Sequence, residues 1–481
     1  MLESLWTVGL VSVEFLIRLG LVGYLLIRQH KSPSSRAAWI VVILALPVAG
    51  GILYVLVGEV RLGSRRVRKY AEIDRLIDER LLTHRPPRFS CSLEIPAEFI
   101  QIAHLAELTG GNQPRCGNGL SLINETDSFI QSLVEDIDSA ERHCHLLFYI
   151  ILTDHSATRV VDALLRAAAR EVHCRLLVDS VGSSAFLGSS LRRTLEAGGV
   201  RVVEALPANA LRVLFARIDL RNHRKFAVID GRVGYVGSHN IADAEFAPKP
   251  RYAPWVDVTV RCTGPVVRDL QSLFVRDWYL DTEETLQEVL DDAPSQHADD
   301  VASQVIGTGP TSYAEAMRQL MISAFNVGRE ELVMTTPYFV PDDATATSLR
   351  TAARRGVQTT LILPARNDSP LVAAASRSHF ESLLDAGVRI CEYQKGLLHA
   401  KTLTIDRRMA LVSTANLDRR SFELNFEVSL AVYDSDFASQ VRFLQQSYLN
   451  DSREVVHAAW RRRGWPAKLW QNGVGILSPL L

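Results

Sequence analysis

The sequence predicts an α/β protein with two tandem domains that pack with pseudo-two-fold symmetry, preceded by an N-terminal transmembrane helical hairpin. Three observations support this prediction. The chain has 481 residues, too many for one ordinary hydrophobic core. Two long apolar runs lie near its N-terminus. A polar motif, HRKFAVIDGRVGYVGSHN from His223 to Asn240, is repeated as HAKTLTIDRRMALVSTAN from His399 to Asn416.

The two apolar runs extend from Leu5 to Ile27 and from Ala38 to Gly58, and each has about the twenty residues that a helix needs to cross a bilayer. A short polar loop, Arg28 to Arg36, joins them, which is typical of a transmembrane hairpin. A cleaved signal peptide is disfavoured because no basic leader precedes the first run and no small-residue cleavage pattern follows it. Glu14 and Arg18 are four residues apart, so they can pair on one helix face.

Basic residues are distributed unequally around the two predicted spans. No basic residue precedes the first span, and the loop has three: Arg28, Lys31 and Arg36. Five follow the second span: Arg61, Arg65, Arg66, Arg68 and Lys69. Because positive residues favour the cytoplasmic side, the sequence predicts a multi-pass protein of the cell (inner) membrane with cytoplasmic catalytic domains.

Hydrophobic patterning divides the rest of the chain. We expect transmembrane helices in 1–60, a juxtamembrane connector in 61–118, a first domain in 119–280, an acidic linker in 281–303, and a second domain in 304–481. Each domain shows alternating strand and helix patterns. The predicted strands are 145–152, 175–178, 200–205, 332–336 and 360–363, and the predicted helices are 157–169, 191–197, 344–355 and 379–386.

Each polar motif is predicted to form a β-hairpin. Strands Lys225–Asp230 and Val233–Gly237 flank a two-residue connection, and the second copy has Arg407-Arg408 in that place. If Asp230 pairs with Val233, then Ser238 lies opposite Lys225 and Asn240 opposite His223. The same register in the second copy places Thr414 opposite Lys401 and Asn416 opposite His399. Alternation along a strand then gathers four polar side chains on one face of each hairpin.

Four carboxylates accompany the motifs. Asp230 and Asp406 follow the His of their motif by seven residues, roughly 20 Å along an extended strand. They are therefore expected to be turn residues that do not face the ligand that the His and Lys would bind. Asp257 and Glu427 each follow one hairpin inside a β-patterned run. A buried acid needs a partner, so each can hold the Nδ1–H of the His in its own motif and fix its tautomer. Exposure of these two acids on edge strands is the competing explanation.

Two His, two Lys and two Asn supplied by two halves favour one cleft between the domains. Lys ammonium groups and Asn amides are donors suited to the oxygens of a phosphate. With one His as nucleophile and the other as general acid, a phosphodiester can be opened through a phosphohistidine, with no metal and no cofactor. A single His-x-Lys pattern would carry little weight, but two copies with matching offsets have no simple structural explanation.

The repeated HxKxxxxD pattern, each followed by a hydroxyl residue and Asn, resembles the phospholipase D superfamily. The N-terminal hairpin and the segments RIDLRNHRK, TTPYFVPDD, LPARNDS and SPLL resemble the bacterial cardiolipin synthase family along almost the whole chain. The resemblance implies two phospholipase D-like α/β/α domains and transfer of a phosphatidyl group between two phosphatidylglycerol molecules, forming cardiolipin.

By position, the resemblance assigns catalytic roles to His223, Lys225, His399 and Lys401, with Asp230 and Asp406 completing the two motifs. It assigns phosphate-binding or supporting roles to Ser238, Asn240, Thr414, Asn416, Asp257 and Glu427. We choose His223 as nucleophile and His399 as general acid and base, by analogy with the superfamily. Ser413-Thr414 departs from the Gly-Ser of the first half, but Thr keeps the hydroxyl.

Other functions remain to be weighed against this one. A hydrolytic phospholipase D or a membrane-anchored nuclease would use the same scaffold, but a net charge of -1 gives no general attraction to nucleic acid. A non-catalytic lipid-binding scaffold is a rival function from another class.

The C-terminal tail mixes aromatic and basic residues, as do segments at a lipid headgroup layer: Trp460, Arg461 to Arg463, Trp465, Lys468 and Trp470.

Two further features give weaker information. The six cysteines form no CxxC pair, so neither a disulfide framework nor a zinc site is expected. The sequence leaves the oligomeric state open, a homo-oligomer included.

Overall fold

The structure of the protein is a computed structural model, and it describes residues 2–27, 33–58, 62–82, 95–207, 217, 219–290, 300–311, 313 and 315–476. Several predicted features therefore lie partly outside the described residues. They are the loop between the apolar runs (28–32), Arg61 in the basic cluster after the second run, part of the acidic linker (291–299) and the C-terminal SPLL.

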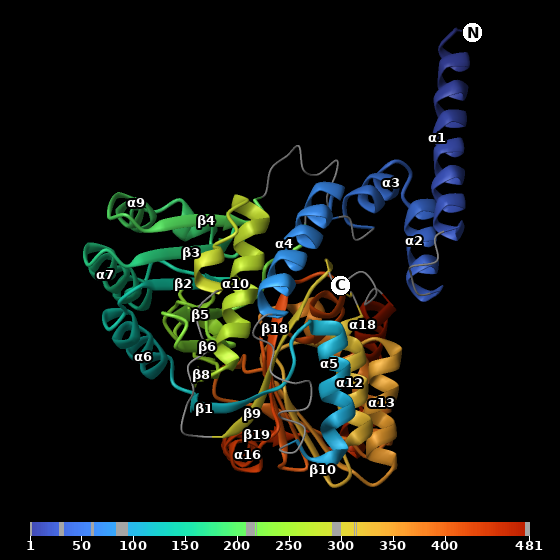
Figure 1. Ribbon diagram of the computed structural model, residues 1–481. Coiled ribbons are helices and arrows are strands. Elements are labelled where there is room, and N and C mark those ends of the chain that lie inside the picture. The colour runs from blue at the N-terminus through green and yellow to red at the C-terminus, as the bar shows by residue number, and fades with distance from the viewer. Residues whose placement is uncertain are drawn as a thin grey trace.

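One sheet of 15 strands runs through both halves of the chain (Figure 1), in the order β19-β13-β12-β10-β15-β16-β18-β9-β1-β8-β6-β5-β2-β3-β4. The order β13-β12-β10-β15-β16-β18-β9 of the second half is the reverse of β1-β8-β6-β5-β2-β3-β4 in the first, if corresponding strands are matched. The two patterns meet where β1 and β9 pair antiparallel. The predicted α/β fold with two repeated domains is confirmed, but the edge-to-edge joining of their sheets was not predicted.

The strands of the first half are β1 (Arg115–Ile123), β2 (His143–Phe148), β3 (His173–Asp179), β4 (Arg201–Ala205), β5 (Phe226–Ile229), β6 (Val233–Gly237), β7 (Trp255–Val256) and β8 (Thr259–Thr263). Those of the second half are β9 (Val301–Thr308), β10 (Glu331–Thr335), β11 (Phe339–Val340), β12 (Gln358–Pro364), β13 (Arg389–Tyr393), β14 (Leu397–Leu398), β15 (Thr402–Ile405), β16 (Met409–Ser413), β17 (Leu417–Asp418), β18 (Glu427–Val432) and β19 (Ser452–Glu454). Strands β1 and β9 thus lie partly in the ranges expected to be connector and linker.

The helices before and within the first half are α1 (Leu2–Ile27), α2 (Pro33–Ala45), α3 (Ala49–Leu53), the π-helical turn η1 (Tyr54–Gly58), α4 (Ser64–Leu82), α5 (Ile100–Gly110), α6 (Thr126–Asp138), α7 (His155–Ala169), α8 (Ser184–Leu187), α9 (Ser190–Ala197), α10 (Val266–Thr282) and α11 (Gln287–Leu290). Those of the second half are α12 (Ala316–Val327), α13 (Asp343–Arg354), α14 (Pro370–Asp385), α15 (Arg419–Glu423), α16 (Ser435–Asn450), α17 (His457–Arg461) and α18 (Trp465–Ile476).

Helices cover both faces of the sheet (Figure 1). In the first half, α6 and α7 bury apolar side chains such as Phe129 and Leu164 against β2 and β3. In the second half, α5, α12, α13 and α14 cover the corresponding face. Helices α10 and α16 share one core with strands of both halves, in which Trp278 and Val441 are fully buried. Because this core is continuous, the halves form one packed body.

The N-terminal apolar runs are helical, but the second is not the single helix that the sequence predicted. It is interrupted after Ala45, between α2 and α3, because Pro47 has no N–H to continue the helix. Glu14 and Arg18 form the predicted ion pair. Glu14 also accepts a hydrogen bond from the Val48 N–H at 3.3 Å. The acid of this ion pair thus also binds a backbone N–H where the helix is interrupted. Among the residues that the structure describes, no helix combines the length and the apolarity needed to cross a bilayer.

The hairpin register differs by one residue from the prediction. Ile229 pairs with Val233, and Ile405 pairs with Met409, so three residues form each connection. Lys225 therefore lies opposite Gly237, whose N–H donates to the Lys225 carbonyl, instead of opposite Ser238. The cause is the backbone of the motif aspartates: Asp230 and Asp406 have φ of 53° and 52°, which makes them part of the turn and not the last strand residue.

The cysteines differ in one respect from the expectation. Cys144, Cys174, Cys262 and Cys391 are free and buried. Cys116 is disulfide-bonded, which the cysteine spacing did not predict.

Candidate active site

The two motif histidines lie at the seam between the halves, because the backbone just before each motif pairs with the opposite half. The backbone N–H of His223 donates to the Phe426 carbonyl at 2.9 Å, and Asn222 and Phe426 form a parallel bridge. In the second motif, β14 pairs in parallel with β7, and the His399 N–H donates to the Val256 carbonyl at 2.8 Å. The backbone therefore brings each His beside the carboxylate-bearing segment of the other half.

Each His is held by a carboxylate of the opposite half, and not by the acid of its own half as the sequence predicted. His223 Nδ1 lies 2.9 Å from Glu427 Oε2, and His399 Nδ1 lies 2.6 Å from Asp257 Oδ1. The four side chains are between 0% and 11% exposed. A carboxylate on Nδ1 holds the N–H there and leaves Nε2 free to act as nucleophile or base. The competing explanation, exposure of these acids on edge strands, is excluded by their burial.

The two motif lysines are buried in the same way. Lys225 and Lys401 are 1% and 2% exposed, and each Nζ donates to the carbonyl of its own motif His at 2.6 Å. Their ammonium groups have further donors to offer, because an ammonium carries three hydrogens. Two buried cations with spare donors form an environment suited to a bound anion.

The motif aspartates lie in the turns, where they bind backbone. Asp230 accepts hydrogen bonds of 2.8 Å from the N–H groups of Glu141, Arg142 and His143, just before β2. Asp406 accepts three from residues 329–331, just before β10, at 2.8–2.9 Å. Neither is hydrogen-bonded to His223 or His399 in the described part of the chain, so their contacts are those of loop anchors at the far end of each hairpin.

The remaining predicted residues divide into two kinds. The hydroxyls of Ser238 and Thr414 are fully buried and engaged: Ser238 Oγ accepts from the Val258 N–H at 3.0 Å, and Thr414 Oγ1 donates to Glu427 at 2.5 Å. Asn240 Oδ1 accepts from the Ile150 N–H, whereas no described residue accepts from the Nδ2 groups of Asn240 and Asn416. These two amides keep their donors available.

Burial sets the protonation states of the site. Burial lowers the pKa of His223 and His399 to about 4, although their carboxylate partners raise it. Burial also lowers the pKa of Lys225 to about 7 and that of Lys401 to about 8. Both histidines are therefore neutral at pH 7 in the ligand-free site. A negative charge placed among these groups would raise all four pKa values.

Two aromatic side chains that the sequence reasoning did not assign to the site pack against the histidines. The Tyr149 ring lies 4.7 Å from the His223 ring and 5.1 Å from Lys225 Nζ. The Trp255 ring lies 4.5 Å from the His399 ring. Their positions gave a signal: Tyr149 directly follows β2, and Trp255 is two residues before Asp257.

Arg224 is a further residue that the sequence reasoning missed. Its guanidinium binds Asp277 of α10 at 2.5 Å and donates to the carbonyls of Glu427 and Thr308, each at 3.0 Å. Arg224 and Asp277 are both buried. This buried Arg inside the first motif holds the backbone of Glu427 beside the adjacent His223.

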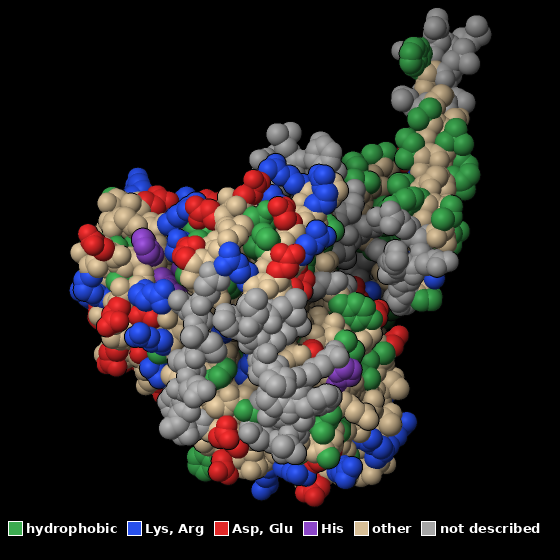
Figure 2. Space-filling model, viewed as in Figure 1, with side chains coloured by type: hydrophobic (Ala, Val, Ile, Leu, Met, Phe, Trp, Pro, Cys, Tyr) green, Lys and Arg blue, Asp and Glu red, His purple; other side chains and the backbone are tan. Residues whose placement is uncertain are grey.

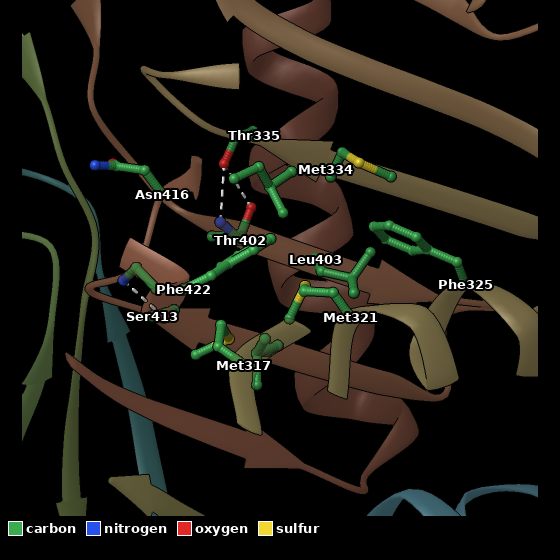
Figure 3. Close-up of a pocket in the computed structure, with 13 residues that line it drawn as sticks. Met317, Met321, Phe325, Met334, Thr335, Thr402, Leu403, Ser413, Asn416 and Phe422 are labelled. Carbon is green, nitrogen blue, oxygen red and sulfur yellow. Dashed lines mark hydrogen bonds between the residues drawn. The ribbon is translucent and has the colours of Figure 1, made fainter. Parts of the chain in front are cut away.

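A small cavity next to the second motif is distinct from this cluster (Figure 3). It leaves about 20 Å³ for a water-sized molecule and has a mainly apolar lining that includes Met317, Met321 and Phe325. Asn416 lines it, but Figure 3 shows the Asn416 amide directed away from the methionines. None of the motif His or Lys residues lines the cavity, which is too small for a lipid group.

Comparisons with known proteins find relatives along almost the whole chain. A family model described as "Cardiolipin synthase, PLD-like domain" matches residues 133–278 and 321–446, and a phospholipase D-nuclease N-terminal model matches residues 19–59. Cardiolipin synthase A of Salmonella paratyphi A is 34% identical over 476 residues, covering 98% of each chain. Cardiolipin synthase A of Cronobacter sakazakii is 36% identical over 471 residues, covering 97% of each.

A solved structure supports the fold. The phosphatidylserine synthase of Haemophilus influenzae Rd KW20 superposes with a TM-score of 0.58 at 15% identity, covering 75% of this chain and 95% of that one.

The crossed pairing can be tested by histidine NMR. Because a carboxylate raises the pKa of an adjacent imidazole, Glu427→Gln should lower the pKa of His223 below about 4 and leave His399 unchanged. Asp257→Asn should do the reverse. The measurement is a pH titration of the full chain with labelled histidines, assigned by His→Gln variants. A pKa change of His223 in Asp257→Asn would contradict the crossed pairing.

Proposed function

The chain belongs to the cardiolipin synthase A family, whose phospholipase D-like domains it contains, and we propose that it joins two phosphatidylglycerol molecules into cardiolipin with release of glycerol. The single observation that carries the proposal is the pair of His–carboxylate contacts, each made across the seam of the halves. Two equivalent imidazoles allow one to act as nucleophile and the other as acid and base.

In the first step, Nε2 of His223 attacks the phosphorus of one phosphatidylglycerol. The bond between phosphorus and the glycerol headgroup oxygen breaks, and His399 donates a proton to that oxygen. The products are glycerol and a phosphatidyl group bonded to His223. The anionic phosphate supports the protonation of His399, because a nearby negative charge raises the pKa of an imidazole that burial holds at about 4.

In the second step, His399 is neutral and accepts the proton of a hydroxyl on the second phosphatidylglycerol. That oxygen attacks the phosphorus, the phosphorus–nitrogen bond to His223 breaks, and cardiolipin is formed. Neither step needs a further reactant. His399 returns to its initial state for the next cycle, as a group that is alternately acid and base must.

The other predicted residues have supporting roles in this proposal. Lys225 and Lys401 donate to the non-bridging oxygens of the phosphate, as do the free amides of Asn240 and Asn416. Ser238 and Thr414 act through protein groups, because their hydroxyls already bind Val258 and Glu427. Asp230 and Asp406 hold the loops before β2 and β10.

Water must be kept from the phosphatidyl intermediate, since its hydrolysis would give phosphatidic acid. His223 and His399 are 9% and 4% exposed, and the rings of Tyr149 and Trp255 cover one side of each. This enclosure favours a transferase over a hydrolase on the same scaffold.

The activity is tested with the full chain in liposomes or detergent and phosphatidylglycerol as the only lipid substrate. The expected products are cardiolipin and glycerol. His223→Ala should lower the rate roughly 10⁴-fold or more, the scale for loss of a catalytic nucleophile. His173→Ala is the matched control, because His173 is exposed on β3 and should leave the rate within about twofold.

Two outcomes would contradict the proposal. Phosphatidic acid without cardiolipin would indicate a hydrolase. Unchanged lipid binding and function in His223→Ala would favour a non-catalytic scaffold.

We further propose how this member of a membrane-associated family meets its membrane. Helix α1 inserts into the inner membrane, because side chains such as Phe15, Leu16 and Leu26 are 59–63% exposed there, and Figure 2 shows hydrophobic groups gathered along it. Helix α18 lies at the headgroup layer. Trp465, Leu469 and Ile476 are 66–75% exposed on the side opposite the buried Val474, beside the basic Arg461 and Lys468. The catalytic halves face the cytoplasm.

This placement is tested with single cysteines carrying an environment-sensitive dye in reconstituted full chain. Dye at Leu16→Cys should be quenched by a spin label at the bilayer centre, and dye at Leu469→Cys by one near the headgroups. Phe443→Cys on α16 is the control, equally apolar and 79% exposed, and should not be quenched. Equal behaviour of positions 469 and 443 would contradict the role of α18. In intact spheroplasts, reaction of Phe443→Cys with an impermeant reagent would contradict the cytoplasmic placement.

A further inference from the structure

A second small cavity lies behind His399, on the side of its carboxylate partner. Among the groups that line it are His239, Trp255 and Asp257. It leaves about 10 Å³ for a water-sized molecule, close to the roughly 10–15 Å³ that a single water needs. The cavity is thus of a size for one small polar molecule and no more.

Two of the residues that line this cavity each have a buried polar atom without a hydrogen-bond partner among the described residues. These atoms are His239 Nε2 and Trp255 Nε1, in side chains that are 2% and 8% exposed. The other ring nitrogen of His239 is engaged with Thr259 Oγ1 at 3.0 Å, and the ring stacks on Phe129 at 4.9 Å. The orientation of His239 is therefore fixed while Nε2 stays unpaired. Leaving buried donors and acceptors unpaired is costly, so the site calls for a ligand.

The two motif carboxylates are supported unequally, and the difference points to the same cavity. Besides His223, Glu427 is contacted by Thr414 Oγ1 at 2.5 Å and by Asn425 Nδ2 at 3.2 Å. In the part of the chain that the structure describes, Asp257 has no recorded donor other than His399. Aspartate is one methylene shorter than glutamate, and Ser238, which corresponds to Thr414, binds the Val258 backbone instead.

The residue between the hydroxyl and the Asn of each motif also differs. It is His239 in the first copy and Ala415 in the second. The copy whose carboxylate has, among the described residues, no direct donor other than a motif His is thus the one that has an additional buried imidazole at its cavity.

We propose that this cavity holds one ordered water that joins His239 and Trp255 to Asp257, which makes His239 a positioning residue for the His399–Asp257 pair. Trp255 Nε1–H donates to the water, and the water donates one hydrogen to the free oxygen of Asp257 and the other to His239 Nε2. His239 is then the tautomer that carries its proton on Nδ1 and donates to Thr259. Three hydrogen bonds are usual for a buried water.

The charges around the cavity are compatible with this tautomer. Burial lowers the pKa of His239 to about 4, with Asp257 raising it and His399 and Lys401 lowering it, so His239 is neutral at pH 7. Asp243 also lines the cavity, and its carboxylate accepts from the N–H groups of His155 and Ser156. The water therefore transmits a hydrogen bond to Asp257, and His239 brings no charge of its own.

The inference rests on the proposed function, because it assigns His239 to the acid and base half of the reaction. His239→Ala should lower kcat for cardiolipin formation about 10-fold and change KM less than twofold, since Asp257 loses its support but the substrate contacts remain. The limb of the pH–rate profile that reports the protonated acid should move to lower pH, because a less well-held carboxylate stabilises the imidazolium less. A purely structural role would lower kcat without moving that limb.

The leaving group provides a second readout. When a phosphatidyl ester of p-nitrophenol is the substrate, the leaving group is p-nitrophenolate, which needs no proton from an acid. His239→Ala should therefore release p-nitrophenolate in the first turnover as fast as the unaltered protein does. His239→Gln, which retains a polar group at the cavity, should recover most of kcat. It also decides the matter if His239→Ala fails to fold.

His379→Ala is the matched control, because His379 is a half-buried histidine that also has a buried, unpaired Nε2, and it lies on α14 outside the cavity. It should stay within about twofold of the unaltered protein. If His239→Ala and His379→Ala give the same kcat and the same pH profile, the inference is wrong. Failure of the proposed function would appear separately, as the absence of cardiolipin with the unaltered protein.

Discussion

The contact on which the site depends is the hydrogen bond that each motif histidine makes to a carboxylate of the other half. Glu427 holds His223, and Asp257 holds His399, both through Nδ1. Neither half contains a complete pair, so the site exists only if the halves are held in one arrangement. The continuous sheet through β1 and β9, the strand pair β7–β14 and the buried contacts of Arg224 all maintain that arrangement.

Burial then defines what this arrangement can do. The cost of placing charge in the interior keeps both histidines neutral and brings the pKa of Lys225 to about 7. A ligand-free site of this kind has an excess of donors and few stable positive charges. An anionic phosphodiester supplies the missing negative charge and thereby promotes protonation of the acid that must release the headgroup. The proposed chemistry is thus coupled to the charge of its substrate.

Much of this could be predicted from the sequence. Periodicity located most of the parallel strands and α7, α9 and α13, and the repeated motif gave the two-fold organisation. The turn geometry was harder to predict, because either two or three residues can connect the strands of a hairpin. Only the positive φ of Asp230 and Asp406 distinguishes the three-residue connection from the two-residue one. The start of α14 was missed, although Ser369 and Pro370 are a helix start signal, because the alanines that follow lack a clear apolar period.

The crossed pairing could not be predicted either. The sequence indicated that Asp257 and Glu427 are acids near the motifs. Which acid lies beside which His depends on the strand pairing at the seam, which the sequence does not reveal.

The most direct test maps the covalent intermediate formed from a phosphatidyl ester of p-nitrophenol with radioactive phosphorus. We expect label on His223, still formed in Asp257→Asn and largely lost in Glu427→Gln. Label on His399, or loss of label in Asp257→Asn with retention in Glu427→Gln, would contradict it.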